Sequence, residues 1–184
     1  MKKAILAAAL LAALPAAATD LLPEARKVAG ALPGKLLAVL TVEMDQGGPE
    51  GAISACRDKA PQIAKAASAE TGWAIRRVSL NNRNPKAVPD AWERAVLEEF
   101  DRRAAAGENP KTLEKGEVVA DGERKSYRYM KALPTVDLCL NCHGAHASLS
   151  PAVRDKLAAL YPQDKAVGYS LGQIRGAMTL KKPL

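Results

Sequence analysis

The spacing of apolar residues predicts two helices in the first part of the chain. Residues 21 to 45 are rich in Ala and Leu, and their apolar positions recur at helical spacing. We expect Pro33-Gly34 to interrupt this helix and Gly47-Gly48-Pro49 to end it. A second helix is predicted to begin near Glu50 and to bend at Pro61, whose ring removes a backbone donor. Its apolar face comprises Ile53, Cys56, Ala60, Ile63 and Ala67.

Alternating apolar and polar residues predict strands in the second part of the chain, after a helix stop at Gly72. The strand segments are 73–80, 117–120, 125–133 and 173–180. Asp121-Gly122 is a strong turn signal, so the middle two segments should form a hairpin. Within it, Tyr127, Tyr129 and Leu133 share one face. Pro134 should end its second strand.

Two further helices have clear start signals. Asp90-Ala91-Trp92-Glu93 resembles a capping box, with Asp as the cap. Ser150-Pro151 combines a capping Ser with Pro at the first helical position. The order of elements is helices, strand, helix, hairpin, helix and strand, which is typical of an α+β fold with a small antiparallel sheet.

The first 18 residues have the pattern of a secretory signal peptide. Lys2 and Lys3 form a positive segment, residues 4–14 are apolar, and Ala16-Ala17-Ala18 offers a cleavage site. The apolar stretch is short for a bilayer and no comparable run follows it, so we expect no membrane span. The sequence therefore predicts export to the periplasm.

The net charge is moderately positive and evenly distributed. It is +7 for the whole chain and +5 without Lys2 and Lys3. No basic block of the kind that binds nucleic acid is present. A mildly basic surface suits docking to an acidic redox partner, and it equally suits ordinary solubility.

The segment Cys139-Leu140-Asn141-Cys142-His143 has the spacing of a c-type haem attachment motif. Two cysteines separated by two residues can form thioethers with the two haem vinyl groups, and the following His then lies beneath the iron. In an exported protein this motif predicts one covalently bound haem c, with His143 as an iron ligand.

Two other interpretations use the same residues. Cys139, Cys142, Cys56 and one His would be an acceptable zinc ligand set, but zinc sites normally show a second closely spaced pair. A redox-active CxxC disulfide would open a helix after a strand in a βαβ context, which is not visible here. Export and the adjacent His143 favour the haem.

The residues alone leave the second axial ligand open. His146 is too close to His143 to reach the opposite face of the haem, and we expect it to face solvent. Methionine is the usual second ligand in electron carriers, although methionines in apolar stripes mostly pack in cores. The candidates are Met44, Met130, Met178, Cys56, a lysine and water.

Several segments together resemble the domain-of-unknown-function family of PAS-like exported c-type haem proteins. They occur in family order over most of the chain beyond the signal peptide. The segments are Ala52 to Cys56, Ala60-Pro61, Asn84-Pro85, Pro89 to Glu93, Tyr127-Arg128-Tyr129, Cys139 to Gly144, and Gly172 to Ala177.

The resemblance implies a PAS-like antiparallel sheet with flanking helices around the haem. Residues 49–184 would form this haem domain and residues 19–48 an N-terminal helical segment. It also implies an axial pair of His143 and the thiolate of Cys56. A thiolate favours ferric iron, so the reduction potential should be low. Pro33-Gly34 departs from the longer helix of the family, on which a helix-mediated homodimer would depend.

Haem propionates need hydrogen-bond donors, and arginine suits a carboxylate. Arg76, Arg77, Arg128 and Arg175 lie in or beside the segments of the expected site. Tyr127 or Tyr129 is expected to pack on the haem.

The sequence therefore predicts a periplasmic mono-haem cytochrome for low-potential electron transfer or small-ligand sensing. A redox or signalling protein would be its partner, and a small gas could bind where Cys56 leaves the iron. The alternative is a haem enzyme that acts on sulfur compounds or peroxide through a Cys-ligated haem. A second haem motif and an evident general-base group are both absent from the sequence.

Overall fold

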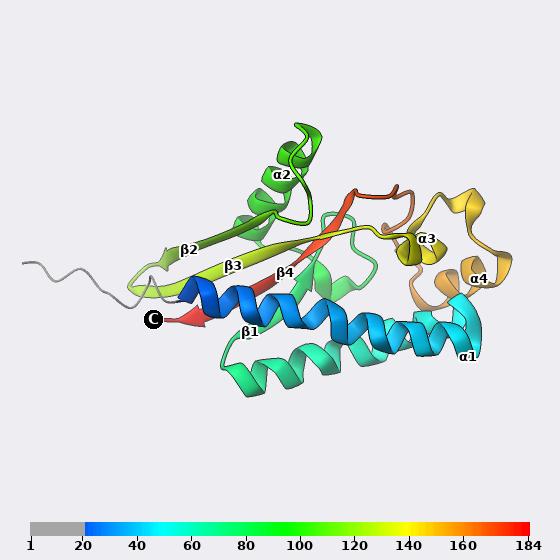
Figure 1. Ribbon diagram of the computed structural model, residues 1–184, viewed down its shortest axis with the longest axis horizontal. Helices are drawn as coiled ribbons and strands as arrows, with labels where there is room; N and C mark the ends of the chain where they lie inside the picture. The colour runs from blue at the N-terminus through cyan, green and yellow to red at the C-terminus, as the bar shows by residue number, and fades with distance from the viewer. Residues whose placement is uncertain (1–20) are drawn as a thin grey trace, which may run out of the picture.

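The computed structural model describes residues 21–184, so the predicted signal peptide lies outside the described residues. The fold is an antiparallel sheet between helices, with a small helical region at one end (Figure 1). In chain order the elements are α1 (Leu21–Thr71), β1 (Ala74–Val78), η2 (Pro85–Ala87), α2 (Ala91–Ala105), β2 (Glu114–Asp121), β3 (Arg124–Pro134), α3 (Asp137–His143), η3 (His146–Ser148), α4 (Pro151–Leu160) and β4 (Ile174–Pro183).

Helix α1 is a hairpin of two helical arms. Gly48 has φ 63° and ψ −172°, a left-handed conformation that glycine adopts at little cost, and the chain turns back there (Figure 1). Glu43 on the first arm (residues 21–47) forms an ion pair with Lys59 on the second arm (residues 49–71). The helix end predicted at Gly47-Gly48-Pro49 is confirmed.

The prediction that Pro33-Gly34 interrupts the first arm is wrong, because helical dihedrals continue through it, as they do through Pro61. Proline inside a helix removes one hydrogen bond and costs about 3 kcal/mol. The first arm offsets this cost by burying Ala25, Ala29 and Leu32 against the sheet.

The four strands pair in the order β1-β4-β3-β2, and every pair is antiparallel. The hairpin of β2 and β3 turns at Gly122, which has φ 60°, as the Asp121-Gly122 signal predicted. β4, the last strand of the chain, lies between β1 and β3. These features confirm the α+β class with an antiparallel sheet and flanking helices.

Each face of the sheet is covered by its own helix. The arms of α1 pack on one face, where Trp73, Tyr127, Tyr129 and Leu180 form the centre of the core. α2 packs on the other face through Val96 and other apolar residues, and its predicted Asp90–Glu93 capping box is present.

A third apolar cluster joins the region around the turn of α1 to the small helical region that contains α3 and α4. Ile53 of the second arm packs against Leu149, Val153 and Leu157, and Cys142 lies at its edge. The Ser150 side chain accepts a hydrogen bond from the Val153 N–H, as its capping role predicted. This cluster brings Cys142 next to the second arm of α1, which carries Cys56.

Candidate functional site

The motif Cys139 to His143 forms the short helix α3. Residues three and four positions apart lie on the same face of a helix, so the two cysteines and the histidine project together. α3 ends at Gly144, where an added Cβ would lie 2.7 Å from the Leu140 carbonyl oxygen. Glycine therefore lets the chain leave the helix directly after His143.

The imidazole of His143 is oriented by a backbone hydrogen bond. Its Nδ1 lies 2.6 Å from the carbonyl oxygen of Ala166, so Nδ1 carries the proton and Nε2 remains available as a ligand. The backbone N–H groups of Gly168 and Tyr169 donate to the carbonyls of Gly144 and His143, which holds the two segments side by side. Burial, and secondarily the nearby guanidinium of Arg175, lower the pKa of His143 well below 6.5. The ring is therefore neutral at pH 7, as a metal ligand must be.

Cys142 is half-buried beside the turn of α1. Its Sγ lies 3.8 Å from the carbonyl oxygen of Pro49. Burial raises the pKa of its thiol to about 11. As a free thiol it would therefore stay protonated and unreactive at neutral pH.

Cys56 on the second arm of α1 faces the same region. Solvent reaches its side chain, yet the protein around it raises the pKa of the thiol by burial. The guanidinium groups of Arg77, Arg175 and Arg83 act in the opposite direction, because positive charge favours the thiolate.

Two arginines near the cysteines have buried donors without partners. Among the described residues, Nε of Arg77 and Nη1 of Arg175 are buried and make no hydrogen bond. Burial lowers the pKa of both guanidinium groups, and each also acts on the pKa of His143 and Cys56. An unpaired buried donor costs about 1–3 kcal/mol, so this arrangement is suited to an anionic group that would pair with them.

The structure places two of the predicted site residues elsewhere. Arg128 lies on the α2 face of the sheet, paired with Asp90 and Glu93 and stacked on Trp92. The predicted role of Arg128 as a propionate donor is wrong, because Asp90 and Glu93 on the α2 face already balance its charge, although its Nε is also a buried donor without a partner. Tyr129 is buried under α1, and its hydroxyl donates to Glu114 at 2.7 Å, so it does not line the cysteine region.

The other axial candidates are also placed by the structure. Met130 and Met178 pack in the two cores of the sheet, the ordinary role of buried methionines. Met44 is half-buried on the first arm of α1, and His146 is exposed in η3 as expected. Within residues 21–184 no three His, Cys, Asp or Glu side chains are grouped closely enough to hold a metal ion.

Two residues of the site have no clear signal in the sequence. Arg83, in the loop after β1, donates to the carbonyl of Cys142 at 2.6 Å and pairs with Asp164. The ring of Tyr169 lies edge-on to His143, with centroids 6.5 Å apart. Both come from irregular segments, where periodicity does not indicate orientation.

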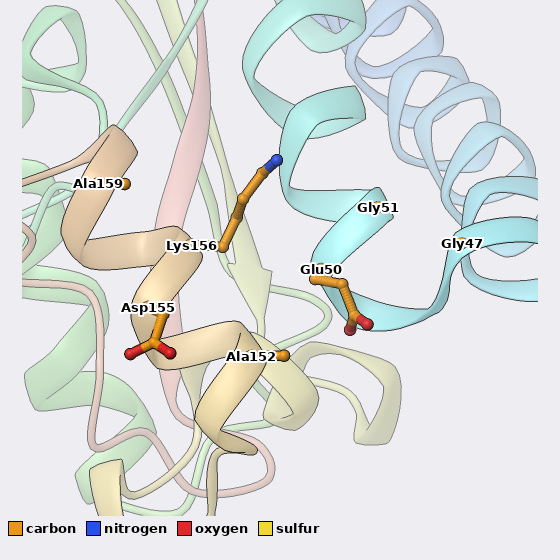
Figure 2. A pocket seen from close by; sticks show the side chains of 7 residues that line it. All are labelled: Gly47, Glu50, Gly51, Ala152, Asp155, Lys156 and Ala159. Carbon is orange, nitrogen blue, oxygen red and sulfur yellow. The ribbon is translucent and has the colours of Figure 1, made fainter.

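An open groove of about 490 Å³ lies beside this region, between the turn of α1 and α4 (Figure 2). Its lining consists of Gly47, Glu50, Gly51, Ala152, Asp155, Lys156 and Ala159. No cysteine or histidine lines it, so the groove is separate from the cysteine region. None of the described helices is both long and apolar enough to cross a membrane.

Comparisons with known proteins agree with this fold. The crystal structure of the cyanobacterial heme-protein Tll0287 matches with a TM-score of 0.67 and 23% sequence identity, over 89% of this chain and 95% of that one. No curated protein matches. The family model Tll0287-like: Tll0287 matches residues 6–183, nearly the whole sequence. The chain therefore belongs to the Tll0287-like family.

Proposed function

We propose that the protein carries one haem, bound covalently through Cys139 and Cys142, with Nε2 of His143 as an iron ligand. A solved relative of the same fold is a heme-protein. On the helical turn of α3 both thiols and the imidazole share one face, and the Ala166 carbonyl leaves Nε2 available. With a pKa of about 11, the free thiol of Cys142 would be unreactive at neutral pH, and a thioether bond to haem would give this cysteine a function.

The observation that carries this proposal is the pair of unpartnered donors on Arg77 and Arg175. Both guanidinium groups lie near the cysteines and His143, and neither is paired with a carboxylate. A haem brings two propionates, which form charge-assisted hydrogen bonds with arginine. Of the four arginines predicted from the sequence, these two fit the cofactor.

We assign the second axial position to Cys56. It is accessible, it lies near enough to Cys139 and Cys142 to affect the pKa of Cys142, and it has no disulfide partner. Its pKa is raised by burial, so it would become a thiolate only beside additional positive charge, such as that of iron. A His/thiolate pair supplies a one-electron centre of low potential.

These features support an exported protein that transfers electrons at low potential or senses a small ligand. Release of Cys56 from ferrous iron would open a position for a gas such as carbon monoxide or nitric oxide. A separate redox or signalling protein would be the partner. The mildly basic net charge suits an acidic partner surface.

The test is electron paramagnetic resonance of the ferric holoprotein, after a pyridine haemochrome assay for haem c. We expect a c-type spectrum in the wild type and no covalent haem in the Cys139→Ser/Cys142→Ser variant. Thiolate-type low-spin g-values should disappear in Cys56→Ala and persist in Met44→Leu, the matched control on the other arm of α1. A preparation without covalent haem contradicts the proposal, and a signal that survives in Cys56→Ala contradicts the axial assignment.

A further inference from the structure

Arg83 and Asp164 form a nearly buried ion pair directly behind His143. Nε of Arg83 lies 2.9 Å from Oδ2 of Asp164, and the two side chains are only 10% and 11% exposed. Nη2 of Arg83 also donates to the carbonyl of Cys142 at 2.6 Å. This pair therefore connects the loop after β1 to the end of α3 and to the segment before β4.

The same pair acts on the carbonyl that orients His143. The oxygen of Ala166 accepts from Nδ1 of His143 at 2.6 Å and from Nη2 of Arg83 at 3.3 Å. Oδ1 of Asp164 accepts from the Ala166 N–H at 2.8 Å, which fixes the peptide unit that precedes this carbonyl. Because this one oxygen accepts from two donors, the cationic Arg83 draws electron density from it and weakens the hydrogen bond from His143.

We propose that Arg83 and Asp164 are positioning residues that set how strongly His143 donates electrons to iron, and thereby set the redox equilibrium. The inference rests on the proposed function, because it requires a haem at His143. A stronger hydrogen bond from Nδ1 makes the imidazole a more basic ligand, which favours ferric iron. Arg83 weakens that bond and adds positive charge, and both effects favour ferrous iron. Asp164 offsets the charge.

The two residues should therefore shift the equilibrium in opposite directions. Arg83→Gln removes the cation and leaves the Ala166 carbonyl to His143, so the reduction potential should fall. Asp164→Asn keeps an oxygen for the Ala166 N–H and leaves the Arg83 charge unbalanced, so the potential should rise. We expect the ferrous to ferric ratio at a fixed poise to change by about tenfold in each case, which is about 59 mV for a one-electron couple.

The experiment is a potentiometric titration of the purified holoproteins, followed by their haem absorption spectra. Arg103→Gln is the matched control, because Arg103 also forms an ion pair, with Glu108, but lies at the end of α2. Its potential should equal that of the wild type. Arg83→Lys keeps the charge and should retain most of the wild-type potential. If Arg83→Gln does not fold, Arg83→Ala replaces it and should also lower the potential.

Shifts of opposite sign support the inference, since damage to the structure alone would move both variants in the same direction. Equal potentials, or shifts of the same sign, with haem c present in the pyridine haemochrome assay would overturn it and leave the proposed function intact. Absence of covalent haem from the wild type would overturn both, so the two failures are distinguishable.

Discussion

Replacing Glu93 with Gln should destabilise the fold more than any exposed charge change on the same helix. The Glu93 side chain is 2% exposed on the sheet side of α2. Its carboxylate pairs with Arg76 of β1 and with Arg128 of β3, at 3.2 Å. It also accepts from the hydroxyl of Thr179 on β4 at 3.0 Å and from the Asp90 N–H at 2.8 Å. One carboxylate therefore joins three neighbouring strands to α2.

The loss in free energy of unfolding depends on which partners of Glu93 can find other hydrogen-bond or ion-pair partners. Removing one partner of a buried ion pair costs about 3–5 kcal/mol. Arg76 is 44% exposed and can be hydrated, and Arg128 keeps Asp90 at 2.7 Å, so we expect a value near the lower end, about 3 kcal/mol. The Thr179 hydroxyl and the Asp90 N–H donate to different oxygens of the carboxylate, so the single oxygen of Gln can keep only one of these two hydrogen bonds.

Urea unfolding followed by circular dichroism measures this change as a lower midpoint with an unchanged slope. Glu98→Gln is the control, because Glu98 is exposed on the same helix and should change the free energy of unfolding by less than about 0.5 kcal/mol. If Glu93→Gln costs no more than Glu98→Gln, the buried carboxylate contributes nothing beyond its hydrogen bonds, and the reasoning is refuted.

Three further changes test other parts of the fold. Val153→Ala removes fully buried methyl groups where α4 meets α1, and should lower the free energy of unfolding by about 2 kcal/mol in urea titrations; a loss equal to that of an exposed alanine substitution would contradict the packing. Gly176→Ala should reduce the yield of folded protein and the urea midpoint, because φ is 152° and the new Cβ would overlap the Val78 carbonyl oxygen; an unchanged midpoint would refute this. The hydrogen bond from Trp73 lowers the pKa of Glu24 below its usual 4.5, so Glu24 stabilises the protein above that pH and the effect is lost as pH falls through the folded pKa. The midpoint difference between wild type and Glu24→Gln should therefore be larger at about pH 6 than at about pH 3, and a constant difference would count against this titration.

Most of the fold could be predicted from local signals. The turn at Gly48, the capping box at Asp90 and the hairpin at Asp121-Gly122 are each specified by neighbouring residues, and all three are confirmed. Pro33 shows where local rules fail. Its intrinsic cost is real, but burial of the first arm on the sheet outweighs it, and that burial depends on residues far away in the sequence.

The sequence predicts residues of the candidate site only where they belong to a recognisable motif. The Cys139 to His143 spacing predicts the two cysteines and the histidine as site residues, and the structure places them together on α3. The choice among arginines depends on the face to which each is directed, and Arg128 is directed to the α2 carboxylates whereas Arg77 and Arg175 lie near the cysteines. Arg83 lies in an irregular loop and donates hydrogen bonds to the backbone carbonyls of Cys142 and Ala166, and such contacts cannot be predicted from the pattern of side chains.

The central position of β4 has a consequence for how the chain folds. Ala74 of β1 pairs with Lys181 of β4, and β4 also separates β1 from the β2–β3 hairpin. The sheet therefore cannot close until the end of the chain has arrived, and contacts of such long sequence separation form slowly. Arg175, at the start of β4, reaches the cysteine region only in that last step. Under the proposed function, haem attachment at the Cys139 to His143 segment would therefore take place before the sheet is complete.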